Sequence, residues 1–162
     1  MSMMPRVAGR LGGFGALLVG AVLAACSHAS PGKVELVDAP PTGEVAAYVA
    51  GEVPHAVRDG KQLLVYVGAT WCEPCLKFHA AAAAGRLDAD LGDLRFLVFD
   101  LDRDETRLAA AGYKSQYVPL FAVPGPDGRA SGAQHDGVKT DGDYLTQIVR
   151  HVRELAPRPA AP

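Results

Sequence analysis

The segment with the most specific chemistry is a pair of cysteines, Cys72 and Cys75, separated by two residues. Glu73 and Pro74 lie between them, and Trp71 precedes them. Two thiols at this spacing can exchange electrons with another protein by closing and opening a disulfide. The same pair can instead form an inert structural disulfide, or supply two soft ligands to a metal such as copper(I).

The cysteines lie between a predicted strand and a predicted helix. The apolar run 63–67 suits a buried strand, and the alanine-rich segment 73–84 suits a helix. Cys72 therefore falls at the helix N-terminus, where free N–H groups and the helix dipole stabilise an anion, and we expect it to react as a thiolate. Cys75 lies one turn further on the same face, so the pair can close a disulfide with little backbone movement. Pro74 falls in the first turn, where its missing N–H is harmless.

This placement favours redox chemistry over a structural disulfide or a metal site. A metal would find at most three nearby ligands, Cys72, Cys75 and His79, whereas closed structural zinc sites use four. The alternative function is a binding module without redox turnover, either a copper carrier or a chaperone-like domain.

The strand, the segment 69–75 (Ala-Thr-Trp-Cys-Glu-Pro-Cys) and the helix after it resemble the thioredoxin superfamily, and the resemblance spans about 63–155. It implies an α/β, thioredoxin-like fold with a central mixed β-sheet flanked by helices. It also implies a thiol–disulfide oxidoreductase that works through the Cys72–Cys75 pair, with no other cofactor and no metal. The Cys-Glu-Pro-Cys form resembles membrane-tethered, envelope-facing members of the superfamily.

The same resemblance implies a role for each residue of the site. Cys72 would attack a substrate disulfide, and Cys75 would resolve the mixed disulfide that results. Pro119 would follow a cis peptide bond and face the cysteines, while Val118 would offer its backbone to a substrate peptide. Trp71 would cover the site and contact substrate.

The buried acid–base pair of many cytoplasmic thioredoxins is replaced in this sequence. They have a buried aspartate six residues before the first cysteine and often a lysine on the next strand, where this chain has Tyr66 and, approximately, Val98. The group that deprotonates Cys75 is therefore open. Glu73 is one candidate, directly or through water, although its charge opposes thiolate formation. Lys77 and His79 would favour the thiolate if they faced the site.

Residues 1–25 are typical of a secretory signal peptide. They open with Arg6 and Arg10, contain no acidic residue, and continue into the apolar run 11–23, which is shorter than the roughly 20 residues of a membrane span. The Leu-Ala-Ala that precedes Cys26 resembles the lipobox of bacterial lipoproteins. In that family the chain is cut before the cysteine, which becomes the lipidated N-terminus.

The lipobox resemblance implies a lipid (palmitate) anchor on Cys26 and a place in the cell envelope, facing the periplasm or the exterior. Ser27 follows Cys26, and the lack of an aspartate there resembles outer-membrane sorting where the envelope is Gram-negative. The expected partners are thiols and disulfides of exported proteins, a membrane electron donor that resets the pair, and the membrane itself.

The rest of the chain predicts one domain between a tether and a tail. Residues 26–43, rich in Pro, Ala, Ser and Gly, predict a flexible tether; residues 44–155 predict the thioredoxin-like domain; and 156–162 predict a disordered tail. Further predicted elements are strands at 45–49, 95–99, 120–123 and 129–133, and helices at 54–59, 106–111 and 144–155, the last capped by Thr140 or Asp141.

The composition excludes several classes of protein. A chain of 162 residues that is 49% hydrophobic can form one domain with a real core and is not intrinsically disordered. Its formal net charge of -2 gives no basic footprint for nucleic acid, and no glycine-rich phosphate motif is present. Three cysteines are too few for a disulfide-stapled scaffold.

Overall fold

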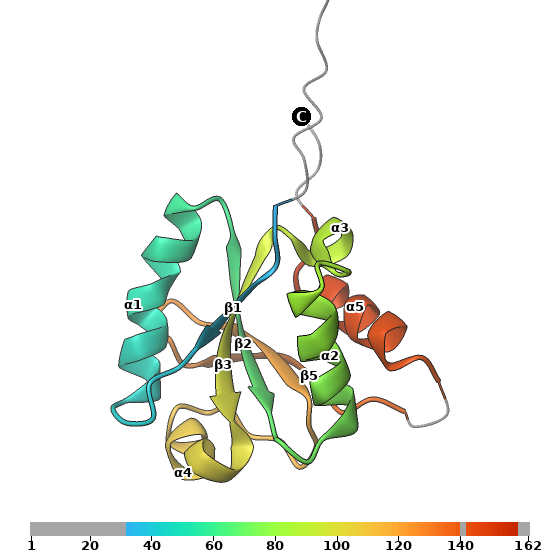
Figure 1. Cartoon of the computed structure of the whole chain (residues 1–162). Coiled ribbons are helices and arrows are strands. Elements are labelled where there is room, and N and C mark those ends of the chain that lie inside the picture. Colours follow the sequence, from blue (N-terminus) through green and yellow to red (C-terminus); the bar gives the residue numbers. More distant parts are fainter. Residues whose placement is uncertain (1–31, 140–141, 159–162) are drawn as a thin grey trace, which may run out of the picture.

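Five strands form a sheet that helices cover on both faces (Figure 1). The structure, a computed structural model, describes residues 32–139 and 142–158. In chain order the elements are β1 (Glu35–Asp38), α1 (Val45–Arg58), β2 (Gln62–Gly68), α2 (Glu73–Ala83), α3 (Asp88–Leu91), β3 (Leu94–Asp100), α4 (Leu101–Ala110), β4 (Leu120–Pro124), β5 (Ala130–Asp136) and α5 (Tyr144–Leu155).

The sheet is mixed, with the strand order β1-β3-β2-β4-β5. The strands β1 and β2 both pair in parallel with β3, whereas β4 runs antiparallel to β2 and β5 antiparallel to β4. The weak strand expected near 129–133 is therefore the second strand of a hairpin. A parallel βαβ unit followed by a hairpin and a helix confirms the expected thioredoxin-like α/β architecture.

Both faces of β2 are buried, which explains its uninterrupted apolar run. Leu64 and Tyr66 belong to the core beneath α2 and α5, while Leu63, Val65 and Val67 belong to the core beneath α1 and α4. Figure 1 shows α1 on one side of the sheet and α2 with α5 on the other. The central strand is thus fixed from both sides, and with it the turn that carries the cysteines.

Residues 35–38 form the edge strand β1, so the flexible tether predicted over 26–43 is wrong for this segment. β1 pairs with β3, and Arg95 of β3 donates a hydrogen bond to Glu35 at 2.6 Å. The strand was not predicted because four residues are too few to show a clear strand pattern. Residues 26–31 of the expected tether lie outside the described part of the chain.

A single helix, α1, replaces the strand expected at 45–49 and the short helix expected at 54–59. Val45 and Val49 are buried and Val53 packs against the same core, so apolar residues recur every four positions, which is a helical period. Pro54 lies inside the helix rather than at its start. The predicted helix began at Pro54 because proline is common in the first turn of a helix.

The helix expected at 106–111 begins earlier, at Leu101. Asp100 ends β3 and caps α4 at once, because its Oδ1 accepts a hydrogen bond from the backbone N–H of Arg103 at 3.0 Å. The strand and the helix are therefore joined without a loop.

The last helix has the predicted span and a different cap. Asp143 caps α5 by accepting a hydrogen bond from the N–H of Leu145 at 3.1 Å, while the expected caps, Thr140 and Asp141, lie outside the described residues. Ala156 is fully buried, so the disordered tail expected from this residue onward is wrong at its start. The short helix α3 was not predicted.

Asp104 is the one charged residue that is fully buried within the described part of the chain. Its carboxylate accepts hydrogen bonds from Arg103 at 2.8 Å, from Arg107 at 2.9 Å and from the backbone N–H of Asp100 at 3.0 Å. Burial raises the pKa of Asp104, but these bonds, led by that of Arg103, outweigh burial, so the net pKa lies below its ordinary range.

We expect Asp104→Asn to lower the free energy of unfolding at neutral pH by about 2 to 3 kcal/mol. Asparagine lacks the negative charge that pairs with Arg103 and Arg107, so both arginines lose their buried partner. A carboxylate whose pKa is lowered by folding stabilises the native state above its unfolded pKa and loses that effect as the pH falls through its folded value. Urea unfolding of the wild-type and Asp104→Asn chains should therefore show a difference in the free energy of unfolding that becomes smaller below about pH 4. A difference in the free energy of unfolding that does not change with pH would contradict this account.

Candidate active site

Cys72 and Cys75 form a disulfide at the N-terminus of α2, with their Cα atoms 5.2 Å apart. Cys72 is the N-cap residue, and its Sγ accepts a hydrogen bond from the backbone N–H of Cys75 at 3.2 Å. Pro74 lies in the first turn, as expected. The exposed fractions of Cys72 and Cys75 are 5% and 2%. After reduction the same N–H and the helix terminus would stabilise a thiolate on Cys72.

Aromatic side chains anchor α2 to the sheet. Phe78, one turn after Cys75, packs against Tyr66, Phe96 and Phe121 with ring centroids 5.2 to 5.4 Å apart. All four rings are almost completely buried. This packing fixes the start of the helix, and hence the disulfide, relative to the sheet.

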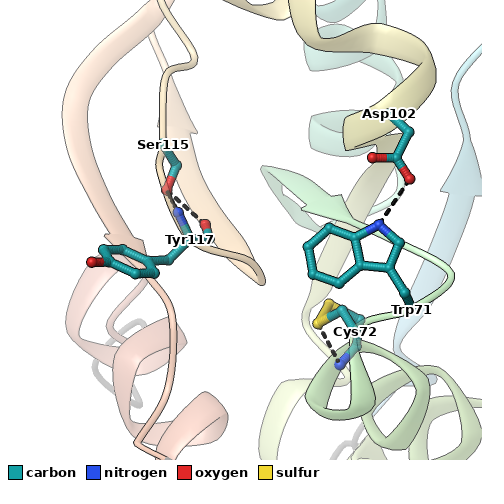
Figure 2. The surroundings of a disulfide bond; sticks show 6 residues. Trp71, Cys72, Asp102, Ser115 and Tyr117 are labelled. Atoms are coloured by element: carbon teal, nitrogen blue, oxygen red, sulfur yellow. Dashed lines mark hydrogen bonds between the residues drawn. A yellow bond between two sulfur atoms is a disulfide. The ribbon is translucent and has the colours of Figure 1, made fainter.

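Trp71 lies at the surface beside the disulfide and is 64% exposed. Its Nε1 donates a hydrogen bond to Oδ2 of Asp102, on α4, at 2.9 Å, and Figure 2 shows the indole directed from the cysteine turn towards that carboxylate. The indole is thus held over the site while much of its surface stays open to solvent. An exposed, oriented indole of this kind suits contact with a partner chain.

The segment that precedes β4 faces the disulfide (Figure 2). The Val118–Pro119 peptide bond is cis, as the resemblance implied, and the carbonyl of Pro119 accepts a hydrogen bond from the N–H of Gly137 at 3.0 Å. Ser115 steadies the same segment, because its Oγ accepts from the backbone N–H of Tyr117 at 2.9 Å. Tyr117 is 65% exposed.

Glu73 forms an ion pair at the surface of the protein. Its carboxylate pairs with Lys77 at 2.9 Å on the exposed side of α2, and the Lys77 ammonium also lies 4.6 Å from the ring centre of Tyr144. The hydrogen bond that the Lys77 ammonium donates to Glu73 raises the pKa of Lys77. Glu73 is thus engaged away from the thiol that it was a candidate to deprotonate.

Tyr66 fills the buried position beneath the cysteine turn. Burial raises the pKa of its hydroxyl far above the ordinary range, so the group stays protonated. Within the described residues this buried hydroxyl has no hydrogen-bond partner. Its oxygen lies so close to Gly68 that a Cβ there would come within 2.4 Å of it, which explains why glycine ends β2.

Two groups at the site were not predicted. No local pattern marks Asp102 as the acceptor of the Trp71 N–H, because the two residues lie on different elements. Ser115 carries no signal in the sequence, because its role depends on the fold of its own segment.

The described residues contain neither a candidate metal site nor a helix that could span a membrane. No group of three or more His, Cys, Asp or Glu side chains in this part of the chain is placed to hold a metal ion. No helix between residues 32 and 158, as far as these are described, has the length and apolar character needed to cross a bilayer.

No protein-family model matches the chain, and no curated protein sequence matches it significantly. Among solved structures it is similar to poplar thioredoxin h, at 19% identity over 79% of this chain and 100% of that one, with a TM-score of 0.46. It is also similar to Trichomonas vaginalis thioredoxin, at 19% identity over 74% and 96% of the two chains and a TM-score of 0.48. A third similar structure is oxidised Arabidopsis thaliana thioredoxin O2, at 17% identity over 76% of this chain and 96% of that one, with a TM-score of 0.44.

Proposed function

We propose that this chain is a thiol–disulfide oxidoreductase of the cell envelope that reduces or exchanges disulfides in exported proteins. The observation that carries the proposal is the Cys72–Cys75 disulfide at the N-cap of α2, where the Cys72 sulfur accepts the Cys75 N–H. A disulfide in this position is readily reopened, because the helix terminus stabilises the thiolate that reduction leaves on Cys72.

The reaction starts from the reduced pair. The Cys72 thiolate attacks one sulfur of a substrate disulfide, and the other substrate sulfur leaves as a thiolate that takes up a proton. Cys75 then attacks Cys72, the bond between Cys72 and the substrate breaks, and two electrons have passed to the substrate. A membrane electron donor resets the pair, and the reverse sequence oxidises a substrate dithiol.

Figure 2 shows the exposed Trp71 beside the disulfide and the segment that carries Tyr117 across from them. Because the cis Val118–Pro119 bond follows Tyr117 directly, these features support binding of an extended substrate peptide next to the disulfide. In this role the backbone of Val118 pairs with the peptide, and the indole of Trp71 covers an apolar side chain of it.

The test of this function is the reduction of insulin by dithiothreitol in the presence of the full chain. We expect precipitation of the insulin B chain to start sooner and proceed faster than with dithiothreitol alone. A reduced chain that binds copper(I) tightly through both thiols, but accelerates exchange no more than free dithiothreitol, would instead support the copper carrier.

The envelope location rests on the lipobox-like segment before Cys26. Expressed in a bacterium fed a labelled fatty acid, the full chain should incorporate the label and sediment with membranes. Cys26→Ser should abolish the labelling, because serine offers no sulfur for the thioether, while insulin reduction by the purified variant stays at the wild-type rate. Equal labelling of both chains would exclude Cys26 as the anchor.

A further inference from the structure

A cavity of about 490 Å³ lies beside Cys75, beneath the cysteine turn. Residues of β1, β2, α2 and α4 and the C-terminal end of β3 line it, so groups that are far apart in the sequence meet there. The titratable side chains in its lining are Asp38, Tyr66, Cys75, His79, Asp100 and Arg103.

Cys75 needs a proton acceptor that the disulfide bond itself does not reveal. To attack the mixed disulfide, its thiol must first lose a proton, and at 2% exposure the charged thiolate is disfavoured by burial. Cys72 has the N-cap position and the N–H of Cys75 to stabilise its charge, whereas Cys75 lies inside the helix. A base that reaches Cys75 from the cavity would supply what the helix terminus does not.

His79 is placed to be that base. It follows Cys75 by four residues on α2, a spacing that brings Cβ atoms to about 5 to 6 Å of each other on one helix face, and both residues line the cavity. A general base can act directly or through one water molecule. Burial lowers the pKa of His79, against the opposing charge of Asp38, so the imidazole is neutral and able to accept a proton at neutral pH.

The other titratable groups that face the cavity are less suited. The Tyr66 hydroxyl is held protonated by burial. Arg103 is a permanent cation whose guanidinium donates a hydrogen bond to Asp104 at 2.8 Å. The carboxylate of Asp100 already accepts a hydrogen bond from the backbone N–H of Arg103. Asp38 lies at the exposed rim, on β1, where its charge acts on His79.

The ring of Tyr66 packs beside His79 in the lining of this cavity. Its ring centre lies 5.3 Å from that of His79, and its buried oxygen has no partner among the described residues. Leaving a buried hydroxyl unpaired costs about 1 to 3 kcal/mol, so this oxygen is a polar group without compensation next to His79.

We propose that His79 accepts the proton of the Cys75 thiol through water in this cavity, with Asp38 stabilising the imidazolium that forms. This inference rests on the proposed function and concerns its second step. The Cys75 proton passes to His79, the Cys75 thiolate attacks the Cys72 sulfur, and the bond between Cys72 and the substrate sulfur breaks. The departing substrate thiolate then takes up one proton, which the imidazolium can return through solvent.

The test separates the two chemical steps in the reduced full chain, as Cys26→Ser, mixed with the aromatic disulfide DTNB. Attack by Cys72 releases one coloured thiolate, and resolution by Cys75 releases the second. We expect His79→Gln to leave the first phase unchanged and to slow the second by at least about tenfold at neutral pH. Only well above the ordinary thiol pKa of about 8.5 should the second phases of the two chains converge, because the buried Cys75 ionises without a base only at such high pH.

His55→Gln is the matched control, since His55 lies on α1 outside the cavity and should change neither phase. A merely structural role for His79 would slow the second phase equally at every pH, and that result, or an unchanged second phase, would overturn the inference. A chain that lacks a fast first phase would instead contradict the proposed function, so the two failures are distinguishable.

Asp38→Asn gives an independent readout, because the residue is exposed and its replacement should leave the fold intact. Below the pKa of His79 the protonated imidazole cannot accept a proton, so the second phase of the wild-type chain should slow as the pH falls through that value. Removing the Asp38 charge should move this midpoint to lower pH. A midpoint that stays in place would overturn the role of the His79–Asp38 pair.

Discussion

Cys72→Ser should reduce the insulin-reducing activity of the chain to the rate of dithiothreitol alone, a loss of at least about a thousandfold in the catalysed rate. Serine preserves the size of the side chain and the N-cap position on α2, but an alkoxide is not formed at neutral pH, and oxygen does not exchange with a disulfide. The measurement is the initial rate of insulin precipitation after subtraction of the uncatalysed rate.

Cys75→Ser is the informative partner of this variant, because it retains the attacking thiol and lacks the resolving one. We expect it to accumulate a mixed disulfide between Cys72 and its substrate, visible as a band of higher mass that a reductant removes. Cys72→Ser should show no such band. Full turnover by the Cys72 variant, or trapping by neither variant, would contradict the assigned order of attack.

Phe78→Ala should lower the free energy of unfolding by about 3 to 5 kcal/mol. The ring is completely buried and touches Tyr66, Phe96 and Phe121, so its removal leaves a cavity that the surrounding rings cannot fill without leaving the sheet. Because small domains are stable by only about 5 to 15 kcal/mol, this is a large part of the total. Urea unfolding of the oxidised chain, followed by circular dichroism, measures the loss.

Leu76→Ala is the matched control on the same helix. Leu76 is 55% exposed, so we expect its truncation to cost no more than about 0.5 kcal/mol. Similar losses for both variants would mean that the aromatic cluster does not anchor α2, and the packing account of the site would then be wrong.

Local patterns predicted the part of the site that lies within one short segment. The strand 63–67, the cysteine turn and the helix from Glu73 are adjacent in the sequence, and their patterns reflect burial on both faces, helix propensity and a helix N-terminus. The cis bond before Pro119 was implied by the resemblance, since the sequence alone cannot distinguish a cis from a trans proline.

The rest of the site depends on contacts between distant residues, which no local pattern reports. The indole of Trp71 donates to Asp102 on another helix, and the cavity beside Cys75 is lined by both Asp38 of β1 and His79 of α2. β1 itself was missed because its strand character comes from pairing with β3 rather than from its four residues. In α1 the helical period of the valines outweighs the local signal of Pro54.

The reduction potential of the Cys72–Cys75 couple tests the central claim most directly. It can be measured by equilibrating the full chain, as Cys26→Ser, with thiol–disulfide buffers and trapping the free thiols for mass analysis. We predict an equilibrium potential between about −270 mV, the level of a reductase that draws on a donor, and about −120 mV, the level of an oxidant that donates its disulfide. A potential below about −300 mV, or a couple that does not equilibrate, would identify a structural disulfide and contradict the account.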